Sequence, residues 1–313
     1  MAMAEGMSQQ TRREFLQEAA GLMVGAAILP VVGQERVIDT HTHFYDIGRP
    51  QGVPWPSRSE AVLYRTHLPG EFGQITAGLG MVGTVVVEAS PWLEDNQWVL
   101  DLARENPVIV GFVGNLAVGE LGFADHLRRF RRNPLFRGLR LGEKSLIGGV
   151  GQVGFMDDLR RMAGEGLALD ALVGLAGLEA VERVAREIPS LRIMIDHLPF
   201  VALDQDPEMA RRRLGPLAAR PNVYAKVSNV IRQRSGKVVT EQGEYRARLD
   251  LLWDLFGGKR LVYGSNWPVS NLVSSYEEQF RVVADYFRAQ GRVAADDYFY
   301  GNSRRFYRWI ERR

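Results

Sequence analysis

The stretch Val37-Ile38-Asp39-Thr40-His41-Thr42-His43 decides how the rest of this 313-residue chain is interpreted. It is a short apolar run that ends in two histidines one residue apart. In an extended segment residues i and i+2 point to the same side, so both imidazoles can converge on one point at a strand end. Such a pair suits a divalent metal ion, or it can handle protons and orient a substrate. Because the chain has only five histidines, we expect this pair to be functional.

Seven further strand-like runs follow this one, and amphipathic stretches separate them. The eight predicted strands are Val37–Asp39, Thr84–Ala89, Val108–Val113, Gly138–Leu141, Leu167–Leu172, Arg192–Asp196, Val223–Val227 and Leu261–Gly264. The predicted helices include Asn96–Glu105, Phe123–Arg132, Met156–Glu165, Leu178–Ile188 and Glu208–Ala219. Apolar strands that alternate with helices indicate a parallel sheet covered on both faces. Eight such units predict an α/β fold, a single-domain (β/α)8 TIM-like barrel, which the chain length allows.

Composition excludes several classes of function. The formal net charge is +2, and the basic residues are scattered apart from short arginine runs that are typical of solvated helix faces. We therefore expect no nucleic-acid partner. The chain contains no cysteine, which excludes disulfides, thiolate metal sites and a cysteine nucleophile.

The first 33 residues are predicted to lie outside the barrel. Adjacent Arg12-Arg13 are followed by Phe15-Leu16 and by a small, uncharged stretch from Ala19 to Val32, which resembles a twin-arginine export signal. The stretch is too short and too rich in glycine for a membrane span, so no stable membrane anchoring is expected. We predict a signal segment over 1–33, a barrel over 34–313 and a periplasmic or secreted protein. The alternative is an amphipathic N-terminal helix on a cytoplasmic protein.

A long irregular segment from Phe44 to about Pro69 directly follows the histidine pair. From Phe44 to Pro69 it contains four prolines and two glycines, a composition that cannot sustain a helix. Loops this long in a compact domain are usually functional. We expect a lid or wall over the site, with a packed surface loop as the alternative.

Polar residues follow each predicted strand, and in a barrel of this kind the chemistry lies at the C-terminal strand ends. The strand-end set comprises His41, His43, Glu88, Ser90, Asn115, Arg137, Arg140, Asp170, Asp196, His197, Lys226, Ser228, Ser265, Asn266 and Trp267. Each residue alone could be structural, and Asp196 could serve only to fix a histidine tautomer. Together they predict a site for a small-molecule substrate.

These motifs, taken jointly, resemble a known family. The His-x-His pair, VVVEAS (85–90), IMIDHL (193–198), NVYAKVS (222–228) and LVYGSNWPVSN (261–271) are similar to those of the amidohydrolase-related metal-dependent hydrolases, the Amidohydrolase 2 branch. Within that branch the resemblance is strongest to the sugar-lactone and 2-pyrone-4,6-dicarboxylate lactonases, whose loop over 49–56 also looks similar. It extends from Val37 to Asn302–Arg305, and it is specific for family and fold rather than for substrate.

The resemblance implies roles for particular residues. His41, His43 and His197 match histidines that bind one divalent, zinc-like ion in some members and hold the substrate carbonyl without metal in others. Arg140, with Arg137 as a further candidate, matches the place where related lactonases hold a carboxylate or oxyanion. The other substrate-binding candidates are Glu88, Asp170, Lys226, Ser228, Trp55 and Trp267. A two-metal site would need a lysine at the end of the fourth strand; Gly138–Leu141 has none and Lys144 lies beyond it, so one metal at most is expected.

The main departure from the family is Asn266. Relatives have an aspartate there, which acts as general base on the attacking water. An asparagine has nearly the same shape but no proton acceptor that titrates near neutral pH. General-base catalysis typically contributes about 10²–10⁴-fold, so we expect a formed binding site, poor turnover and weakened metal binding.

Three explanations of Asn266 remain open. The chain is a deliberately inactivated form, a natural variant that uses another base (His197, His41, Asp170 or Glu88), or a non-catalytic binder of a lactone or sugar acid. The expected activity is hydrolysis of a sugar lactone or a carboxylated lactone by water attack at its carbonyl. The alternatives are a decarboxylase or amide hydrolase of the same superfamily and the non-catalytic binder.

Overall fold

The computed structural model describes residues 35–197 and 206–312. The predicted export signal over 1–33 lies outside these residues. Arg36–Arg313 forms one compact unit. No helix in the described part of the chain has both the length and the apolar character needed to cross a bilayer.

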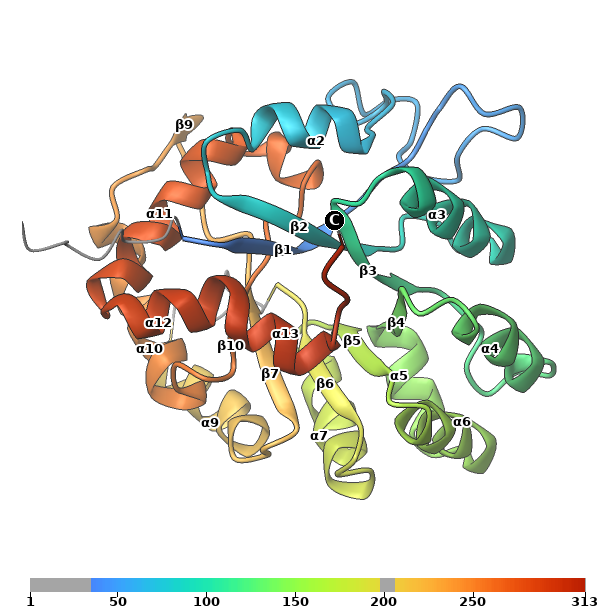
Figure 1. Cartoon of the computed structure of the whole chain (residues 1–313). Helices are drawn as coiled ribbons and strands as arrows, with labels where there is room; N and C mark the ends of the chain where they lie inside the picture. The colour runs from blue at the N-terminus through green and yellow to red at the C-terminus, as the bar shows by residue number, and fades with distance from the viewer. Residues whose placement is uncertain (1–34, 198–205, 313) are drawn as a thin grey trace, which may run out of the picture. The chain divides into compact units, whose positions relative to one another are not determined.

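Eight strands of the described chain form one parallel sheet in the order β1-β2-β3-β4-β5-β6-β7-β10. The strands are β1 (Val37–Thr42), β2 (Met81–Val87), β3 (Ile109–Gly114), β4 (Phe136–Gly142), β5 (Ala168–Leu172), β6 (Arg192–Ile195), β7 (Val223–Val227) and β10 (Leu261–Tyr263). The sheet curls into a nearly closed barrel with helices around it (Figure 1). The predicted TIM-like barrel is confirmed, and each predicted strand overlaps an observed one.

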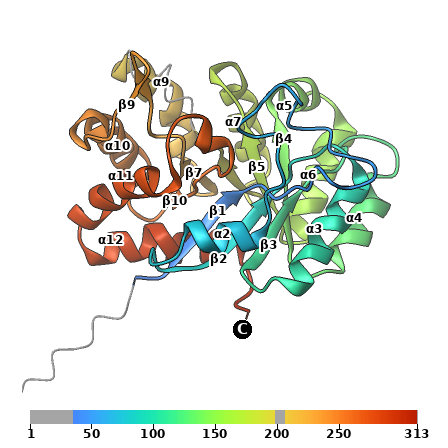
Figure 2. The same ribbon diagram turned by 90° about the horizontal axis from the view of Figure 1, so that it is seen from above.

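Helices occupy the outer layer, as the amphipathic pattern predicts. The main ones are α2 (Pro69–Ile75), α3 (Leu93–Glu105), α4 (Phe123–Arg131), α5 (Glu143–Gly149), α6 (Val153–Gly164), α7 (Leu178–Glu187), α9 (Pro207–Ala218), α10 (Gly243–Phe256) and α11 (Tyr276–Ala289). The C-terminal turns are α12 (Arg292–Asp296), the π-helical η3 (Asp297–Gly301) and α13 (Asn302–Tyr307). Seen from above, α3 to α6 and α9 to α12 lie on opposite sides of the strands (Figure 2).

Short elements outside the repeating pattern complete the chain. They are the 3₁₀ turns η1 (Leu175–Gly177) and η2 (Val269–Leu272) and a two-stranded antiparallel hairpin, β8 (Gln233–Arg234) with β9 (Lys237–Val238). The periodicity of the sequence does not predict this hairpin, because two-residue strands carry no pattern.

The first and last strands meet through side chains and a single bridge. Thr42 pairs with Trp267, and the amide of His43 donates to the carbonyl of Trp267 at 2.8 Å. The carboxylate of Asp39 accepts from the backbone amide of Ser265 at 2.9 Å and from the hydroxyl of Tyr276 at 3.0 Å. This junction fixes the histidine pair against the end of β10.

The barrel interior is apolar at one end and polar at the other. Ile38, Val85, Met194 and Val262 form one buried cluster, which Phe306, Tyr307 and Trp309 complete from the C-terminal segment. That segment crosses the strands near its end (Figure 1), where the amide of Ile310 donates to the carbonyl of Val110. The polar interior therefore lies toward the carboxyl ends of the strands, where the site is expected.

Candidate active site

A cavity of about 430 Å³ opens at the carboxyl ends of the strands. Described residues that line it are His43, Trp55, Glu88, Ala89, Ser90, Pro91, Asn115, Arg140, Leu172, His197, Asn266 and Val269. They come from the ends of seven strands and from the loop after β1. The predicted gathering of strand-end residues at one cavity is present for His43, Glu88, Arg140, His197 and Asn266.

The long loop after β1 forms one wall of this cavity. The ring of Trp55 lies 5.9 Å from that of His43. Arg49 fastens the loop to α3, because its guanidinium contacts the Asp95 carboxylate at 2.5 Å and stacks over Trp98 at 4.8 Å. Of the two interpretations of this segment, the structure supports the wall.

His43 is held in one orientation and one protonation state. Its Nδ1 lies 2.9 Å from the carbonyl oxygen of Val87, which can only accept, so Nδ1 carries the proton. Burial, together with the positive charge of Arg140, lowers the pKa of His43 to about 3. The neutral ring therefore directs the lone pair of Nε2 toward Oδ1 of Asn266, at 3.3 Å.

Asn266 stands at the end of β10 in a left-handed backbone conformation, with φ of 60°. Its Nδ2 donates to Oδ1 of Asn229 at 3.0 Å, and Asn229 also has a positive φ of 54°. His197 is a third strand-end residue of this kind, with φ of 59°. Left-handed backbone is costly for most residues and gathers at functional sites. Asn229 was missed from sequence, although asparagine after a strand is a common signal of this conformation.

His197 follows β6 and faces His41. Its Nδ1 lies 2.7 Å from the hydroxyl of Ser228, and its ring centroid is 4.3 Å from that of His41. Burial lowers the pKa of His197 to about 4. Ser228 thus orients a histidine and does not line the cavity.

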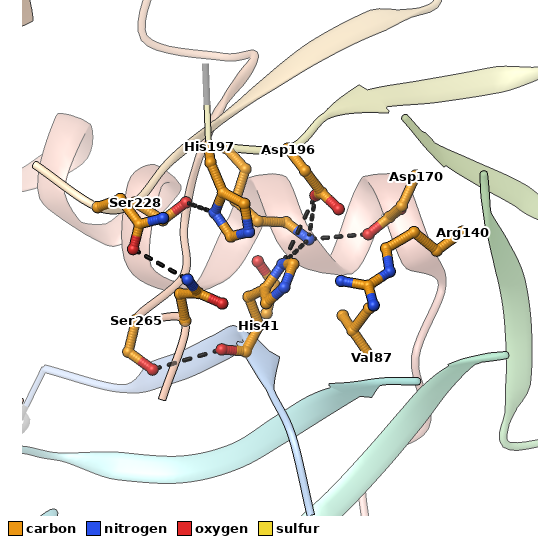
Figure 3. Close-up of polar contacts among 12 residues, drawn as sticks. His41, Val87, Arg140, Asp170, Asp196, His197, Ser228 and Ser265 are labelled. Atoms are coloured by element: carbon orange, nitrogen blue, oxygen red, sulfur yellow. Dashed lines mark hydrogen bonds and ion pairs between the residues drawn. The ribbon is translucent and has the colours of Figure 1, made fainter. Parts of the chain in front are cut away.

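A buried charge network lies beneath these histidines. The Lys226 ammonium contacts Asp170 at 2.8 Å, Asp196 at 2.9 Å and Nδ1 of His41 at 3.1 Å, and all four side chains have no exposed area. In Figure 3 the side chains of Asp170, Asp196 and His41 converge on one point, where the Lys226 ammonium lies. Gly264 makes this packing possible, because a Cβ there would approach both His41 and Lys226 to 3.0 Å.

Burial and the ammonium act in opposite directions on the two carboxyls. Burial raises the pKa of Asp170 to about 6, although Lys226 opposes this shift. For Asp196 burial also acts upward, but Lys226 and His41 outweigh it and hold the pKa of this carboxyl well below its usual value. Asp170 receives a further hydrogen bond from Tyr307, at 2.7 Å. Tyr307 is nearly at the C-terminus, and no sequence motif points to it.

Several residues expected to touch substrate lie elsewhere. Lys226 and Asp170 are fully buried below the cavity and bonded to each other. Trp267 is 1% exposed and packs on Phe44 and His67. Arg137 lies three residues before Arg140, roughly 10 Å earlier along β4, and its charged neighbours are Arg131 and Arg308. The structure differs from the expectation of direct substrate contact for these four residues.

Arg140 lies in the cavity wall, where it is paired with Glu88. Its Nε donates to Oε1 of Glu88 at 2.8 Å, and one terminal nitrogen donates to the Glu88 carbonyl at 2.9 Å. The other carboxylate oxygen of Glu88 accepts from the amide of Ser90 at 2.9 Å. The two side chains are 16% and 13% exposed, so the pair is only partly screened by water.

One group of side chains has the composition of a metal site. His41, Asp196 and His197 place ligand atoms within 4.8 Å of one another, and two histidines with a carboxylate are a known donor set for catalytic zinc. His43 lies outside this group, and Asp196 joins it instead. Within the described chain, Nε2 of His41 and both oxygens of Asp196 make no hydrogen bond, although Oδ1 of Asp196 is ion-paired with Lys226.

The donor set therefore fits one divalent ion, with a constraint from Lys226. An ammonium can only donate, so its contact makes Nδ1 of His41 an acceptor and places the proton of the neutral ring on Nε2. A metal ion at Nε2 would require that proton to move to Nδ1, which Lys226 could then no longer contact as a donor, and the ion would lie near a second positive charge.

Comparison with known proteins places this fold and site in a family. The sequence model described as "Amidohydrolase" matches residues 38–309, which is nearly all of the described chain. The chain belongs to the amidohydrolase family. It is a hydrolase of the amidohydrolase superfamily, and the family resemblance seen in the sequence is confirmed.

Two curated relatives of this amidohydrolase are L-fucono-1,5-lactonases. The protein from Burkholderia ambifaria is 30% identical over 289 residues, covering 87% of this chain and 95% of the relative. The protein from Burkholderia multivorans is 27% identical, covering 82% and 90%.

Solved structures share the fold. An amidohydrolase from Burkholderia multivorans with bound zinc has a TM-score of 0.78 at 23% identity, over 88% of this chain and all of that one. A probable 2-pyrone-4,6-dicarboxylic acid hydrolase from Acinetobacter baumannii, with citric acid bound, has a TM-score of 0.66 at 16% identity, over 87% and 99%.

Proposed function

We propose that this amidohydrolase opens a lactone ring by attack of water at the ring carbonyl, with a sugar lactone or a carboxylated lactone as substrate. The observation that carries this proposal is the convergence of His43, His197 and residue 266 on one cavity, with His41 directly beneath them. The names of the two curated relatives support lactones as the substrate class.

The histidines would polarise the lactone carbonyl. His43 and His197 line the cavity, whereas His41 is fully buried beneath them and would act by orienting His197, whose ring centroid lies 4.3 Å from its own. A hydrogen bond from a histidine ring N–H to the carbonyl oxygen would strengthen as negative charge develops there. It would therefore lower the activation barrier of water attack on the lactone. Where one divalent ion is bound by His41, Asp196 and His197, it would supply the same polarisation as a Lewis acid.

The attacking water would donate a hydrogen bond to the lone pair of His43 Nε2. Oδ1 of Asn266 lies beside that nitrogen at 3.3 Å and would be a second acceptor next to the water. Of the other candidate bases, Asp170 is buried below the cavity and Glu88 is paired with Arg140. The candidate proton acceptors that remain in the described cavity wall are the imidazoles of His43 and His197.

The experiment measures acid release from a panel of aldonolactones and pyrone carboxylates by the unsubstituted protein and by Asn266→Asp. We expect slow hydrolysis of at least one lactone by the first and faster hydrolysis by the second. No hydrolysis by either protein would contradict the proposal. Tight lactone binding without turnover in both would favour the non-catalytic binder, which the missing carboxylate at 266 specifically supports.

Metal content is tested separately. Elemental analysis of the purified chain, of Asn266→Asp and of His197→Asn is expected to give no more than one divalent ion per chain. Equal content in the first two and loss in the third would support His41, Asp196 and His197 as ligands. Metal in none of them would support the metal-free mode.

We also propose that the protein is exported to the periplasm by the twin-arginine route. Fractionation of cells that express the full chain or Arg12→Lys/Arg13→Lys tests this. Loss of the periplasmic form in the variant is expected, and equal cytoplasmic retention of both would overturn the proposal.

A further inference from the structure

The pairing of Glu88 with Arg140 bears on which lactones the site accepts. Nε of Arg140 and one terminal nitrogen are engaged by Glu88, while the second terminal nitrogen has no hydrogen-bond partner among the described residues. The arginine can therefore still donate to a neutral oxygen such as a hydroxyl or a ring oxygen. Its charge, however, is already balanced by a carboxylate at 2.7 Å.

The described cavity wall contains no other lysine or arginine. Its charged members are Glu88 and Arg140 alone. A carboxylate on the substrate would thus find no unpaired cation in the described cavity wall.

The buried charge network beneath the histidines, which we call the floor of the cavity, adds negative charge. Lys226 faces two carboxylates, Asp170 and Asp196, and all three are fully buried. Together with the wall pair, two cations therefore face three carboxylates around the cavity. A buried anion that gains no new charge partner loses its hydration without compensation.

We infer that Glu88 is a specificity-determining residue: by neutralising Arg140 it restricts the site to uncharged polyhydroxylated lactones and excludes lactones that carry a carboxylate. This inference rests on the proposed lactone hydrolysis and narrows its substrate class. It predicts that removing the Glu88 charge makes Arg140 available for a substrate carboxylate.

The test compares two substrates that differ only at C6. Glucono-1,5-lactone carries a hydroxymethyl group there, and glucaro-1,5-lactone carries a carboxylate. The measured quantity is kcat/KM for glucaro-1,5-lactone divided by kcat/KM for glucono-1,5-lactone. It is determined for the unsubstituted protein and for Glu88→Gln, and again for both in the Asn266→Asp background. Glutamine keeps the shape of glutamate and can still accept from the amide of Ser90.

The matched control is Glu182→Gln. Arg220 and Glu182 form a similar part-buried arginine–carboxylate pair at 2.6 Å, on residues that do not line this cavity. We expect Glu88→Gln to raise the ratio by about tenfold or more, because a hydrogen bond to a charged group is worth roughly 1.5–3 kcal/mol. Glu182→Gln is expected to leave the ratio unchanged.

Binding measurements keep the inference testable if turnover is slow. The corresponding 1,5-lactams, which resist hydrolysis, give the same ratio from dissociation constants. A native preference for the carboxylated ligand, an unchanged ratio in Glu88→Gln, or an equal change in Glu182→Gln would overturn the inference. Hydrolysis of neither lactone by any variant, with the lactam ratio as expected, would contradict the proposed function and leave the charge selection standing.

Discussion

The wall and the floor of the cavity use the same kinds of charged residues in different ways. In the wall, Glu88 and Arg140 keep some contact with water and one terminal nitrogen of Arg140 stays free to donate. In the floor, Lys226, Asp170 and Asp196 have no exposed area, and the ammonium is shared between two carboxylates and His41.

This difference suits the wall to ligand recognition and the floor to structural support. A partly exposed arginine can keep its carboxylate partner and still donate one hydrogen bond to a ligand. A fully buried charge offers no atom to a ligand, and removing one of its partners leaves the other without compensation. The floor therefore positions His41, whereas the wall selects and activates what enters.

The largest expected effect is in the wall. Asn266→Asp supplies a titratable carboxylate beside His43, so we expect kcat for lactone hydrolysis to rise by about 10²–10⁴-fold. Initial rates of acid release check this. Asn115→Asp, which adds a carboxylate elsewhere on the cavity lining, serves as the control and is expected to give no such gain. An equal gain in both variants would show a general effect of negative charge.

The next effect is in the floor. Lys226→Met leaves Asp170 and Asp196 buried without their cation, so we expect the free energy of unfolding to fall by about 3–5 kcal/mol. Urea unfolding measures it. Lys259→Met is the matched control: Lys259 pairs with Asp297 but its side chain is 69% exposed, so a loss of at most about 1 kcal/mol is expected. Similar losses in the two variants would remove the distinction between floor and surface charges.

A smaller effect concerns the pH dependence of stability. The pKa of His43 is about 3 in the folded protein, against a usual value of 6.5. Between these values the unfolded chain binds a proton that the folded chain does not, so acidification below pH 6.5 lowers the free energy of unfolding, by at most about 1.4 kcal/mol per pH unit for this residue.

Comparison of the chain with His43→Gln isolates that contribution. Other buried groups, including Asp170 with its raised pKa of about 6, titrate in both proteins and cancel in the difference. Between pH 6.5 and pH 5 the free energy of unfolding is expected to fall more steeply in the unsubstituted protein than in His43→Gln. Parallel losses would mean that His43 is protonated in the folded state.

The smallest effect tests backbone strain in the wall. Asn229 adopts φ of 54° and supports Asn266. Asn229→Ala is expected to lower the free energy of unfolding by about 1 kcal/mol, because left-handed backbone costs alanine roughly 1–2 kcal/mol. Asn229→Gly, which tolerates this conformation, is the control and should be the more stable of the two variants by thermal unfolding.

Much of the fold could be predicted because local pattern and topology agree. Apolar runs separated by amphipathic stretches specify parallel strands with helices between them, and the eight predicted strands match β1 to β7 and β10. The hairpin β8–β9 could not be predicted, since its two-residue strands are mostly exposed and carry no periodicity.

The site was predictable only in part, for a geometric reason. Strand ends meet at one rim, so His43, Glu88, Arg140, His197 and Asn266 were found from their positions after strands. A residue's place after a strand does not tell how deeply its side chain is buried below the rim. Lys226 and Asp170 therefore proved to be buried, and Arg137, which is earlier on the same strand as Arg140, lies away from the cavity.

The sequence by itself determined the barrel, the histidine pair and the unusual Asn266, because each is written in residue order and local periodicity. Only the tertiary structure decided which charges are neutralised. Glu88 is 52 residues from Arg140, Lys226 is 56 from Asp170, and Tyr307 is 137 from Asp170. Such partners are chosen by the closure of the barrel, and they set the charge that a ligand meets.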